Sequence, residues 1–578
     1  MSSTISKLFD SKNRKFEIPA YQRSYSWEEK QILQFIEDLK NAETQYYLGH
    51  FLFSIKENEE NTLLIIDGQQ RLTTCIIFFS CVKNILEFRQ EKGEITTLNL
   101  EDITDYYLRD IRKETQKFKT VNYDNNFFID EIIDGKSYHT QEPDTASKRK
   151  IRKAKEIFTN HLQNESINDI EKWCRLIEFA TITEYIVDNK TQAAQVFAFQ
   201  NDRGKKLSNL EVIKAYFMLQ IYLFSVNEEK TEENIKYLED EFSKIYKQIV
   251  RIKLNEDEVL NYYWRTVSGR GFYSEEVIKG IKESINTTTR DKTVWIKNFM
   301  SGLSQSFQTV EKVEKSENSY TKDLHYLNNM ALAYPFIIKA YKLGEDEKCI
   351  NRLIKLLENI TFRYLLRGGR AEIESRLNHH LINYNNKGDV DKNINDIIGN
   401  LKNHGWWGYW NDSTMKNYLS SGYFYKNRVD NYVLWKYELY ICDDNHPKPH
   451  KVSFEDLIHN ESIEHIAPQT PTNGDPVANG YGIYDDKENP SNGIVSGDWL
   501  NCIGNLMLIS KPHNSSIGNK PFSDKLESYG RDNLLNQQKE IGTYIESRNN
   551  PIWNKDAIKS RKAKIIAAVM DIWNLDRI

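Results

Sequence analysis

A carboxylate followed directly by a histidine is the most reactive pairing in the C-terminal part of the sequence. Glu464 and His465 occupy one short strand-like segment, and a second such segment, Leu506 to Ile509, lies between Asn505 and Asn514. Carboxylate and amide oxygens are hard ligands that suit Mg²⁺, and a neutral imidazole can take a proton from water. Alternation along a regular strand would point neighbouring side chains to opposite faces, so the strand must bend or twist if both are to serve one site.

Near the N-terminus, a polar box separates an apolar strand from an apolar helix. The box is Asp67-Gly68-Gln69-Gln70-Arg71, and the strand before it is Leu63 to Ile66. Such a junction combines free backbone N–H groups with the positive end of a helix, which suits an anion. Arg71 adds a bidentate phosphate donor, and Asp67 could hold a metal or a ribose hydroxyl. An ordinary strand-to-helix turn with surface Gln and Arg remains the plainer interpretation.

Two further segments place arginines in polar turns. One contains Tyr21-Gln22-Arg23, and the other contains Asn201 and Arg203. Ser208 to Glu211 has the pattern of a capping box, so a helix is expected to start there. Each turn alone reads as an ordinary loop, but three of them in one domain favour a converging phosphate pocket.

Periodicity indicates the elements that must position these residues. Helical spacing covers 31–40 after Ser26 as an N-cap candidate, and apolar runs at 50–55 and 62–66 have the length of buried strands. Helical periodicity dominates from about 100 to 440.

The C-terminal part differs in composition from this helical stretch. Residues 469–498 are dense in Gly, Asn, Asp and Pro and read as a long irregular insertion. We therefore expect an α+β multidomain protein that is mostly helical, divided into 1–225, 226–410 and 411–578.

Composition excludes several classes of protein. Hydrophobic residues at 39% and charged residues at 28% are typical of a folded, soluble chain rather than a disordered one. A net charge of −5 argues against a wholly basic surface but leaves room for a local basic groove. The six cysteines form no CxxC pair, which disfavours a disulfide scaffold and a Cys-ligated zinc site. With no export signal or membrane segment, the expected location is the cytoplasm.

The N-terminal motifs resemble a known family. Tyr21-Gln22-Arg23 with Trp27, the DGQQR box and the later Asn201 and Arg203 are similar to the N-terminal domain of GmrSD-type restriction proteins. The resemblance implies a mixed α/β domain related to the ParB/sulfiredoxin fold that binds and hydrolyses a nucleoside triphosphate. It implies the following nucleotide-binding residues: Tyr21, Gln22, Arg23, Asp67, Gly68, Gln69, Gln70, Arg71, Asn201 and Arg203.

The C-terminal motifs resemble the nuclease of the same family. The order of Glu464-His465, Asn505 and Asn514 is similar to an HNH nuclease, the ββα-metal fold. The resemblance implies His465 as general base, Glu464 and Asn514 as metal ligands, and Asn505 as the residue that orients the catalytic loop. The adjacent His513 leaves the last metal ligand open.

Several other features have two interpretations each. Lys520 and Lys525 contact phosphate or only solvate a helix. The arginines of segment 362–370 line a DNA channel or make interdomain ion pairs. The cluster Trp406-Trp407-Gly408-Tyr409-Trp410 packs a seam between domains or forms a platform on which bases stack.

These observations converge on a DNA endonuclease. We expect a GmrSD-like, modification-dependent (type IV) restriction enzyme of antiphage defence, with a nucleotide-binding N-terminal domain and an HNH nuclease using Mg²⁺ or another divalent metal. Its partners would be modified phage DNA and a nucleoside triphosphate of unknown identity, with no membrane, and a homo-oligomer is left open. The alternatives are a nucleotide-gated DNA-binding regulator with a non-cleaving HNH domain and an RNA-targeting HNH nuclease.

Overall fold

The structure is a computed structural model with two compact units. It describes residues 2–9, 14–42, 44–56, 59–135, 142–187, 208–268, 274–289, 291–403, 405–421, 423–444, 453–470, 478–482, 497–531 and 535–578. The first unit comprises 1–264 and 270–314, and the second comprises 265–269 and 315–578. None of the helices among the described residues has the length and apolar character that a membrane span requires.

A mixed six-stranded sheet forms the centre of the first unit, in the order β1-β8-β3-β4-β2-β7. β3 pairs antiparallel with β4 and parallel with β8, and β2 runs parallel to both β4 and β7. The strands of this unit are β1 (Ser2–Thr4), β2 (Lys15–Glu17), β3 (Tyr47–Lys56), β4 (Glu59–Asp67), β5 (Arg109–Asp110), β6 (Thr115–Gln116), β7 (Phe118–Lys119) and β8 (Thr181–Val187).

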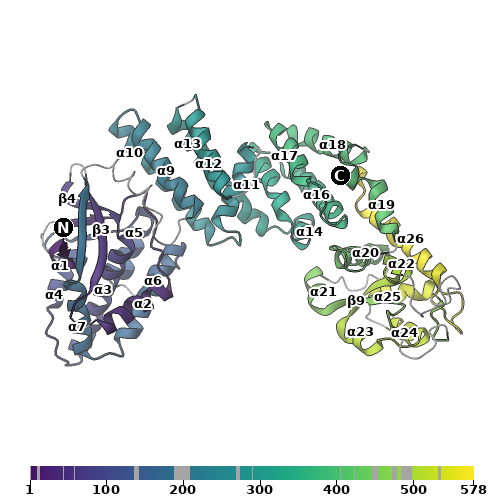
Figure 1. The fold of residues 1–578 in the computed structure, drawn as a ribbon, viewed down its shortest axis with the longest axis horizontal. Helices are drawn as coiled ribbons and strands as arrows, with labels where there is room; N and C mark the ends of the chain where they lie inside the picture. The colour runs from purple at the N-terminus through teal and green to yellow at the C-terminus, as the bar shows by residue number, and fades with distance from the viewer. Residues whose placement is uncertain are drawn as a thin grey trace. The chain divides into compact units, whose positions relative to one another are not determined.

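One helix, α3 (Gln69–Glu91), is buried along most of its length in this unit. It contacts α6 and α7, and α2 contacts the same two helices, so these four lie together beside β3 and β4 (Figure 1). A helix covered on most sides must be apolar around its circumference, which explains the continuous apolar run after the DGQQR box. The helices of this unit are α1 (Ile5–Phe9), α2 (Glu29–Asn41), α3, α4 (Leu100–Ile103), α5 (Asn122–Phe128), α6 (Ala146–Leu162), α7 (Ile167–Glu178), α9 (Asn209–Phe224), α10 (Glu228–Ile249), α12 (Ser274–Thr287) and α13 (Lys292–Glu314), together with the part of α11 (Glu256–Ser268) up to Trp264.

The described part of the second unit is helical apart from one pair of strands. β9 (Glu461–His465) and β10 (Leu506–Ser510) pair antiparallel, with His465 opposite Leu506 and Glu464 opposite Met507. The helices are α14 (Ser319–Tyr326), α15 (Tyr334–Leu343), α16 (Glu347–Leu366), α17 (Ile373–Asn383), α18 (Asp389–Lys402), α19 (Asp412–Ser420), α20 (Asp430–Asp444), α21 (Phe454–Asn460), α22 (Gly497–Leu500), α23 (Lys511–Ile517), α24 (Phe522–Tyr529), α25 (Asn536–Lys539) and α26 (Lys555–Ile572), with 3₁₀ turns η4 (Gly408–Trp410) and η6 (Ile503–Asn505).

The strand pair separates two apolar cores. Leu506 and Leu508 belong to a core with α20 and α26, whereas Met507 and Ile509 belong to another that contains Ile517 of α23. Residues alternate between the faces of a strand, so Ser462 and Glu464 lie on the α23 side. The order strand, strand, helix is therefore β9, β10, α23, as the sequence predicted.

A buried arginine holds the start of β10. Arg561 of α26 is fully buried, and its Nη1 donates to the carbonyls of Gly504 (3.0 Å) and Leu506 (2.6 Å). Its Nε lies 3.1 Å from the carboxylate of Glu540. The guanidinium satisfies carbonyls at the turn into β10, where an unpaired polar group would be costly.

The described elements confirm most of the predicted ones. The mostly helical α+β class is confirmed, the two apolar runs are β3 and β4, and the capping box at Ser208 begins α9. Ser26 as the N-cap of the next helix is wrong, because α2 begins after Glu28 and the N–H of Ser26 instead donates to Gln70. Most of the irregular segment 469–498 lies outside the described residues, and the division at 225 and 410 stays a prediction.

Gly68 provides a test of the strand-to-helix junction. Its φ is +92°, and a Cβ at this position would overlap the ring of Phe51. We expect Gly68→Ala to lower the unfolding free energy of the first unit by about 2–4 kcal/mol, since a left-handed L-residue and overpacking each contribute.

Gly93 is the matched control, because its φ is +88° and nothing lies within 4 Å of the added Cβ. Gly93→Ala should lose only about 1–2 kcal/mol. Denaturant titration measures both variants, and equal losses would show that Phe51 moves aside without cost.

Candidate functional site

Hydrogen bonds join the first two N-terminal motifs. The Nε2 of Gln22 donates to the carbonyl of Ile66 (2.5 Å), at the end of β4. Gln70 accepts from the N–H of Ser26 (2.7 Å) and donates to the carbonyl of Ser24 (3.0 Å). Two of the three segments expected to converge are therefore hydrogen-bonded to each other through Gln22 and Gln70, and the phosphate pocket itself stays a prediction.

Arg71 is engaged by the neighbouring strand. Its two terminal nitrogens donate to the carbonyls of Leu48 (2.8 Å) and His50 (2.7 Å) of β3. Asp67 lies 3.8 Å from the same guanidinium, with 57% of its side chain exposed. Gly49 has a φ of +104°, and a Cβ there would overlap Arg71. The guanidinium is thus seated against β3 rather than extended into solvent.

The remaining members of the predicted nucleotide site differ in their surroundings. Tyr21 is buried, and Gln69 is 5% exposed with an amide oxygen that has no hydrogen-bond partner among the described residues. Burial raises the pKa of Glu211 on α9, while the charge of Arg23 opposes the rise, so Arg23 lies near the start of that helix. Asn201 and Arg203 lie outside the described residues.

A buried lysine under the Tyr21-Gln22-Arg23 turn was missed by sequence reasoning. Lys214 of α9 is 1% exposed, and its Nζ donates to the carbonyl of Gln22 (3.0 Å) and the hydroxyl of Tyr123 (3.3 Å). Burial lowers its pKa to about 8. A single lysine in the otherwise apolar run 212–219 was the available signal.

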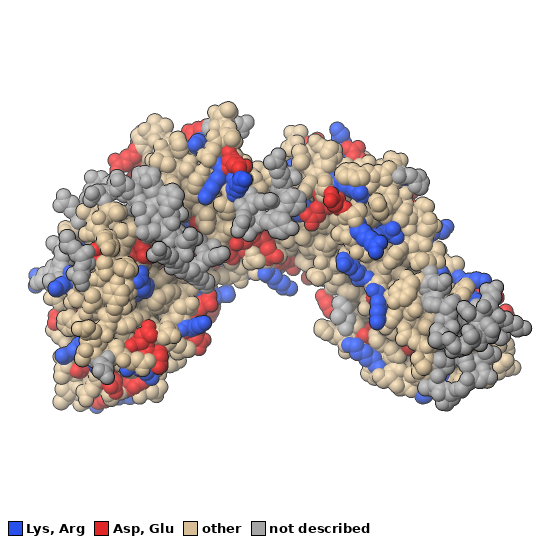
Figure 2. Space-filling view, viewed as in Figure 1, with Lys and Arg blue, Asp and Glu red and all other residues tan. Residues whose placement is uncertain are grey.

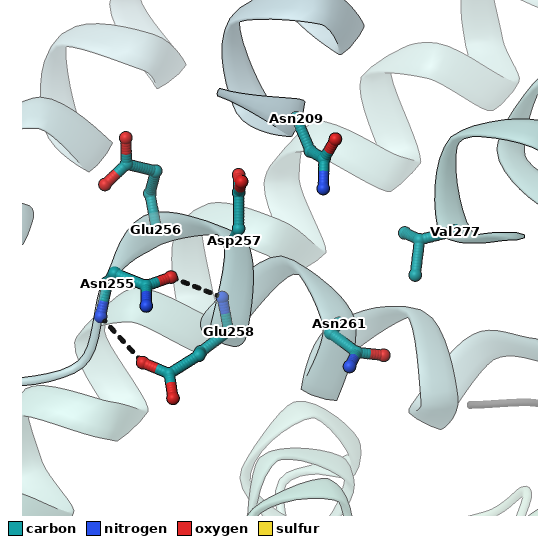
Figure 3. Close-up of a pocket in the computed structure, with 7 residues that line it drawn as sticks. All are labelled: Asn209, Asn255, Glu256, Asp257, Glu258, Asn261 and Val277. Atoms are coloured by element: carbon teal, nitrogen blue, oxygen red, sulfur yellow. Dashed lines mark hydrogen bonds between the residues drawn. The ribbon is translucent and has the colours of Figure 1, made fainter. Parts of the chain in front are cut away.

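A cavity opens beside the first turn of α9, at the end of the third motif. It has a volume of about 420 Å³. Figure 3 shows its lining residues, which include Asn209, Asp257, Glu256 and Val277. Asp257 accepts from the N–H of Leu210 (3.2 Å) at the helix start. Because its walls carry carboxylates, this cavity does not suit a triphosphate.

At the nuclease end, Glu464 is paired with a buried lysine. Its carboxylate accepts from the Nζ of Lys525 (2.5 Å) and from the hydroxyl of Tyr529 (3.2 Å), both on α24. Glu464 is 5% exposed and Lys525 is fully buried. Burial raises the pKa of Glu464, and the charge of Lys525 opposes the rise. The prediction that Lys525 contacts phosphate or solvates a helix is therefore wrong, because it has no exposed surface.

His465 lies on the other face of β9, beside two amides and a tyrosine. Its Nε2 is 3.2 Å from the Oδ1 of Asn501 and 3.3 Å from the side-chain nitrogen of Gln469. Its ring meets that of Tyr425 edge-on at 4.5 Å. Burial lowers the pKa of His465 to about 4. The imidazole is therefore neutral at pH 7, the form that can accept a proton.

Asn505 braces the loop that follows His465. Its Oδ1 accepts from the N–H of Ala467 and from the indole of Trp553, both at 2.9 Å. Its Nδ2 donates to the carbonyls of Ala467 (3.1 Å) and Leu500 (2.9 Å). Two acceptor and two donor positions are all used, so this side chain positions the loop rather than a ligand.

The two residues left open for the last metal ligand point to different places. Asn514 donates to the hydroxyl of Ser462 (2.9 Å), on the Glu464 face of β9. His513 has both ring nitrogens engaged, with Ser528 (2.5 Å) and Gln538 (3.2 Å). Asn514 is therefore the one that shares a face of the strand pair with Glu464.

These residues do not fit a divalent ion as they lie. Glu464 and Asn514 offer oxygen donors of the right kind. However, the carboxylate of Glu464 is already neutralised by Lys525. The described part of the chain also contains no group of three His, Cys, Asp or Glu side chains that could hold a metal.

The arginines of the middle segment divide between the interior and the surface. Arg363 is 1% exposed and donates to the carbonyls of Trp410 (2.9 Å) and Trp573 (2.8 Å). It cannot line a channel, and its ion pair with Asp412 (2.7 Å) lies within the second unit. Arg370, in contrast, is exposed.

The comparisons with known proteins define the class. The family model described as "GmrSD restriction endonuclease, N-terminal domain" matches residues 5–218. The model described as "GmrSD restriction endonucleases, C-terminal domain" matches residues 410–568. Both describe restriction endonucleases, so the chain is a nuclease of the restriction class. It belongs to the GmrSD restriction endonuclease family. No curated protein sequence matches it.

A restriction endonuclease acts on DNA, which makes DNA the partner of this chain. Lys and Arg side chains recur along the visible face of the second unit, with few Asp or Glu among them (Figure 2). Such a distribution offers phosphate contacts despite the acidic total charge.

The buried pair at the nuclease end gives a stability prediction. Lys525→Met should lower the unfolding free energy of the second unit by about 3–5 kcal/mol, because it leaves the Glu464 carboxylate buried without a counter-charge. Combining it with Glu464→Gln should recover much of the loss, since neither charge then remains. Denaturant unfolding of both variants and of Glu464→Gln alone gives a double-mutant cycle, which measures the interaction free energy of the pair. A Lys525→Met variant as stable as the parent would show that the pair contributes nothing.

Proposed function

We propose that the chain is a nucleotide-regulated, modification-dependent (type IV) DNA endonuclease of antiphage defence, with an HNH-type nuclease in the second unit. The observation that carries the proposal is His465, a neutral imidazole at the end of β9 in a strand, strand, helix order, with its following loop fixed by Asn505. An imidazole in this state can take the proton of the attacking water during phosphodiester hydrolysis. Gln469 and Asn501 hold the ring by its Nε2 side.

The first unit would bind and hydrolyse a nucleoside triphosphate at the DGQQR box. The box begins α3, whose N-terminal N–H groups and positive helix end favour an anion. Asp67 is exposed beside it, and the unpartnered amide oxygen of Gln69 supplies an acceptor. Gln22 and Gln70 hydrogen-bond the Tyr21-Gln22-Arg23 turn to the box. A ligand that moves one of these two segments would therefore move the other.

Nucleotide state would then control cleavage. Phosphodiester hydrolysis by a histidine general base does not need a triphosphate. The presence of a triphosphate site and a nuclease site in one chain therefore favours control of cleavage by the nucleotide. A tenfold effect on the cleavage rate needs about 1.4 kcal/mol of difference in nucleotide affinity between two states.

One observation favours a second function, a DNA-binding regulator that does not cleave. Lys525 forms an ion pair with Glu464, whose carboxylate would be a metal ligand according to the family resemblance. If that pair persists when DNA is bound, the nuclease fold serves as a binding module. A cleavage assay with plasmid, phage DNA bearing modified bases, and RNA, with and without Mg²⁺ and each triphosphate, separates the two functions.

His465→Ala should reduce DNA cleavage by about 10²–10⁴-fold, because it removes the proposed general base. Triphosphate hydrolysis should stay near the parental rate, since His465 and the box lie in different units. The control is His459→Ala, an exposed histidine six positions earlier, which should cut normally. Initial rates on a cleavable DNA are the measurement, and parental cleavage by a folded His465→Ala would remove that residue from the mechanism.

Asp67→Ala should impair triphosphate binding or turnover without unfolding the first unit. The side chain is 57% exposed, so its loss disturbs packing little. Glu91→Ala removes an exposed carboxylate from the far end of the same helix and serves as control. Nucleotide affinity is measured by titration calorimetry and turnover by phosphate release for both variants. Unchanged affinity and turnover in Asp67→Ala would show that the carboxylate of the box has no part in nucleotide binding.

A further inference from the structure

An aromatic cluster with an exposed edge lies between α18 and α19 in the second unit. Trp407 and Trp410 are buried, whereas Trp406 is 60% exposed and Tyr409 is 53% exposed. The buried pair meets edge-on, with ring centroids 5.7 Å apart. Two large aromatic side chains thus stay at the surface although the same short segment supplies two others to the core.

Hydrogen bonds from neighbouring residues fix the backbone of the turn that carries this cluster. The hydroxyl of Thr414 donates to the carbonyl of Gly408 (2.8 Å), and Arg363 donates to that of Trp410 (2.9 Å). Asn411 caps α19 through the N–H of Thr414 (2.8 Å). The exposure of Trp406 and Tyr409 is therefore a property of an ordered turn.

The guanidinium of Arg376, on α17, lies under these rings. Its Cζ is 4.5 Å from the ring centroid of Trp410, 4.6 Å from that of Trp406 and 5.8 Å from that of Tyr409. Cation–π attraction of this kind favours Arg, whose planar group stacks on aromatic faces. Arg376 is 5% exposed because the rings cover it.

This guanidinium lacks the partners that a buried charge requires. Its Nε and Nη1, and the indole nitrogen of Trp410, have no hydrogen-bond partner among the described residues. No ion pair with Arg376 is formed among the described residues; burial lowers the pKa of the guanidinium, and the charge of Glu372 only partly opposes the lowering. A covered cation with unused N–H groups is costly unless an anion or acceptor reaches it.

We propose that this cluster, Arg376 with Trp406, Tyr409 and Trp410, binds an unstacked nucleotide of the DNA. The base would stack on the exposed faces of Trp406 and Tyr409, and a rotation of these two side chains would admit its phosphate to Arg376, which they cover in the free chain. Charge complementarity selects the occupant, because an apolar protein partner would leave the guanidinium unpaired whereas a nucleotide supplies both a flat ring and an anion. The inference rests on DNA being the substrate and adds a site remote in sequence from the nuclease residues.

The test is DNA binding by the full-length chain carrying His465→Ala, so that no DNA is cut. Fluorescence anisotropy at fixed salt compares a single-stranded oligonucleotide, a duplex with one extrahelical nucleotide and the same duplex fully paired. Trp406→Ala should weaken binding to the first two by at least about tenfold, and binding to the paired duplex by less than about threefold. Arg376→Met should weaken the same two probes and lower the salt slope by about 0.7, which Trp406→Ala should leave unchanged.

Ile382→Ala, which removes an exposed apolar side chain from the same helix as Arg376, is the control and should bind as the parent does. Thermal melting checks that Arg376→Met stays folded, and equal weakening of all three probes by this variant would indicate a structural role instead. Equal affinities of Trp406→Ala and the parent for unpaired DNA would overturn the inference while leaving the endonuclease proposal intact. A parent that binds none of the three probes would overturn both.

Discussion

A pair of strands has too few neighbours to be stable alone, so the nuclease end depends on what holds β9 against β10. The buried guanidinium of Arg561 supplies this constraint, by donating to carbonyls at the turn into β10 and pairing with Glu540. Asn505, just before that strand, then fixes the loop after His465. With the pair fixed, α24 can place Lys525 against Glu464 on one face, while His465 occupies the other.

At both ends of the chain, motif residues form hydrogen bonds with neighbouring segments of the protein itself. Gln22, Gln70 and Arg71 bind backbone carbonyls or N–H groups of neighbouring segments, as Asn505 does in the second unit. Polar side chains bonded to the backbone in this way hold a loop in one conformation, which is what a preorganised site requires. Among the described motif residues, Asp67, Gln69 and Asn514 keep side-chain atoms that could still bind a ligand.

Local signals in the sequence predicted the elements that depend on near neighbours. The apolar run and box predicted β4 and α3, and the Ser208 capping box predicted the start of α9, because caps and periodicity act within a few residues. The very short β2 and β7 carry no such signal, since their pairing is set by strands far away in sequence. β8 is rich in β-branched residues, a local strand signal that the surrounding helical periodicity obscured. Glu464 and His465 were recognisable as a pair, but Lys525 was not recognisable as the partner of Glu464. The contact between Lys525 and Glu464 joins residues 61 positions apart and depends on how α24 packs.

The order in which the chain is synthesised gives Trp553 and Arg561 a further consequence. Trp553 completes the hydrogen bonds of Asn505, and Arg561 completes those at the turn into β10. Both residues follow every other member of the candidate nuclease site in sequence. A ribosome must therefore translate past Arg561 before the loop after His465 can be braced, whereas the strands and helices around the DGQQR box are available long before. In the nascent protein the elements around the box would therefore form first, and the braced strand pair of the second unit last.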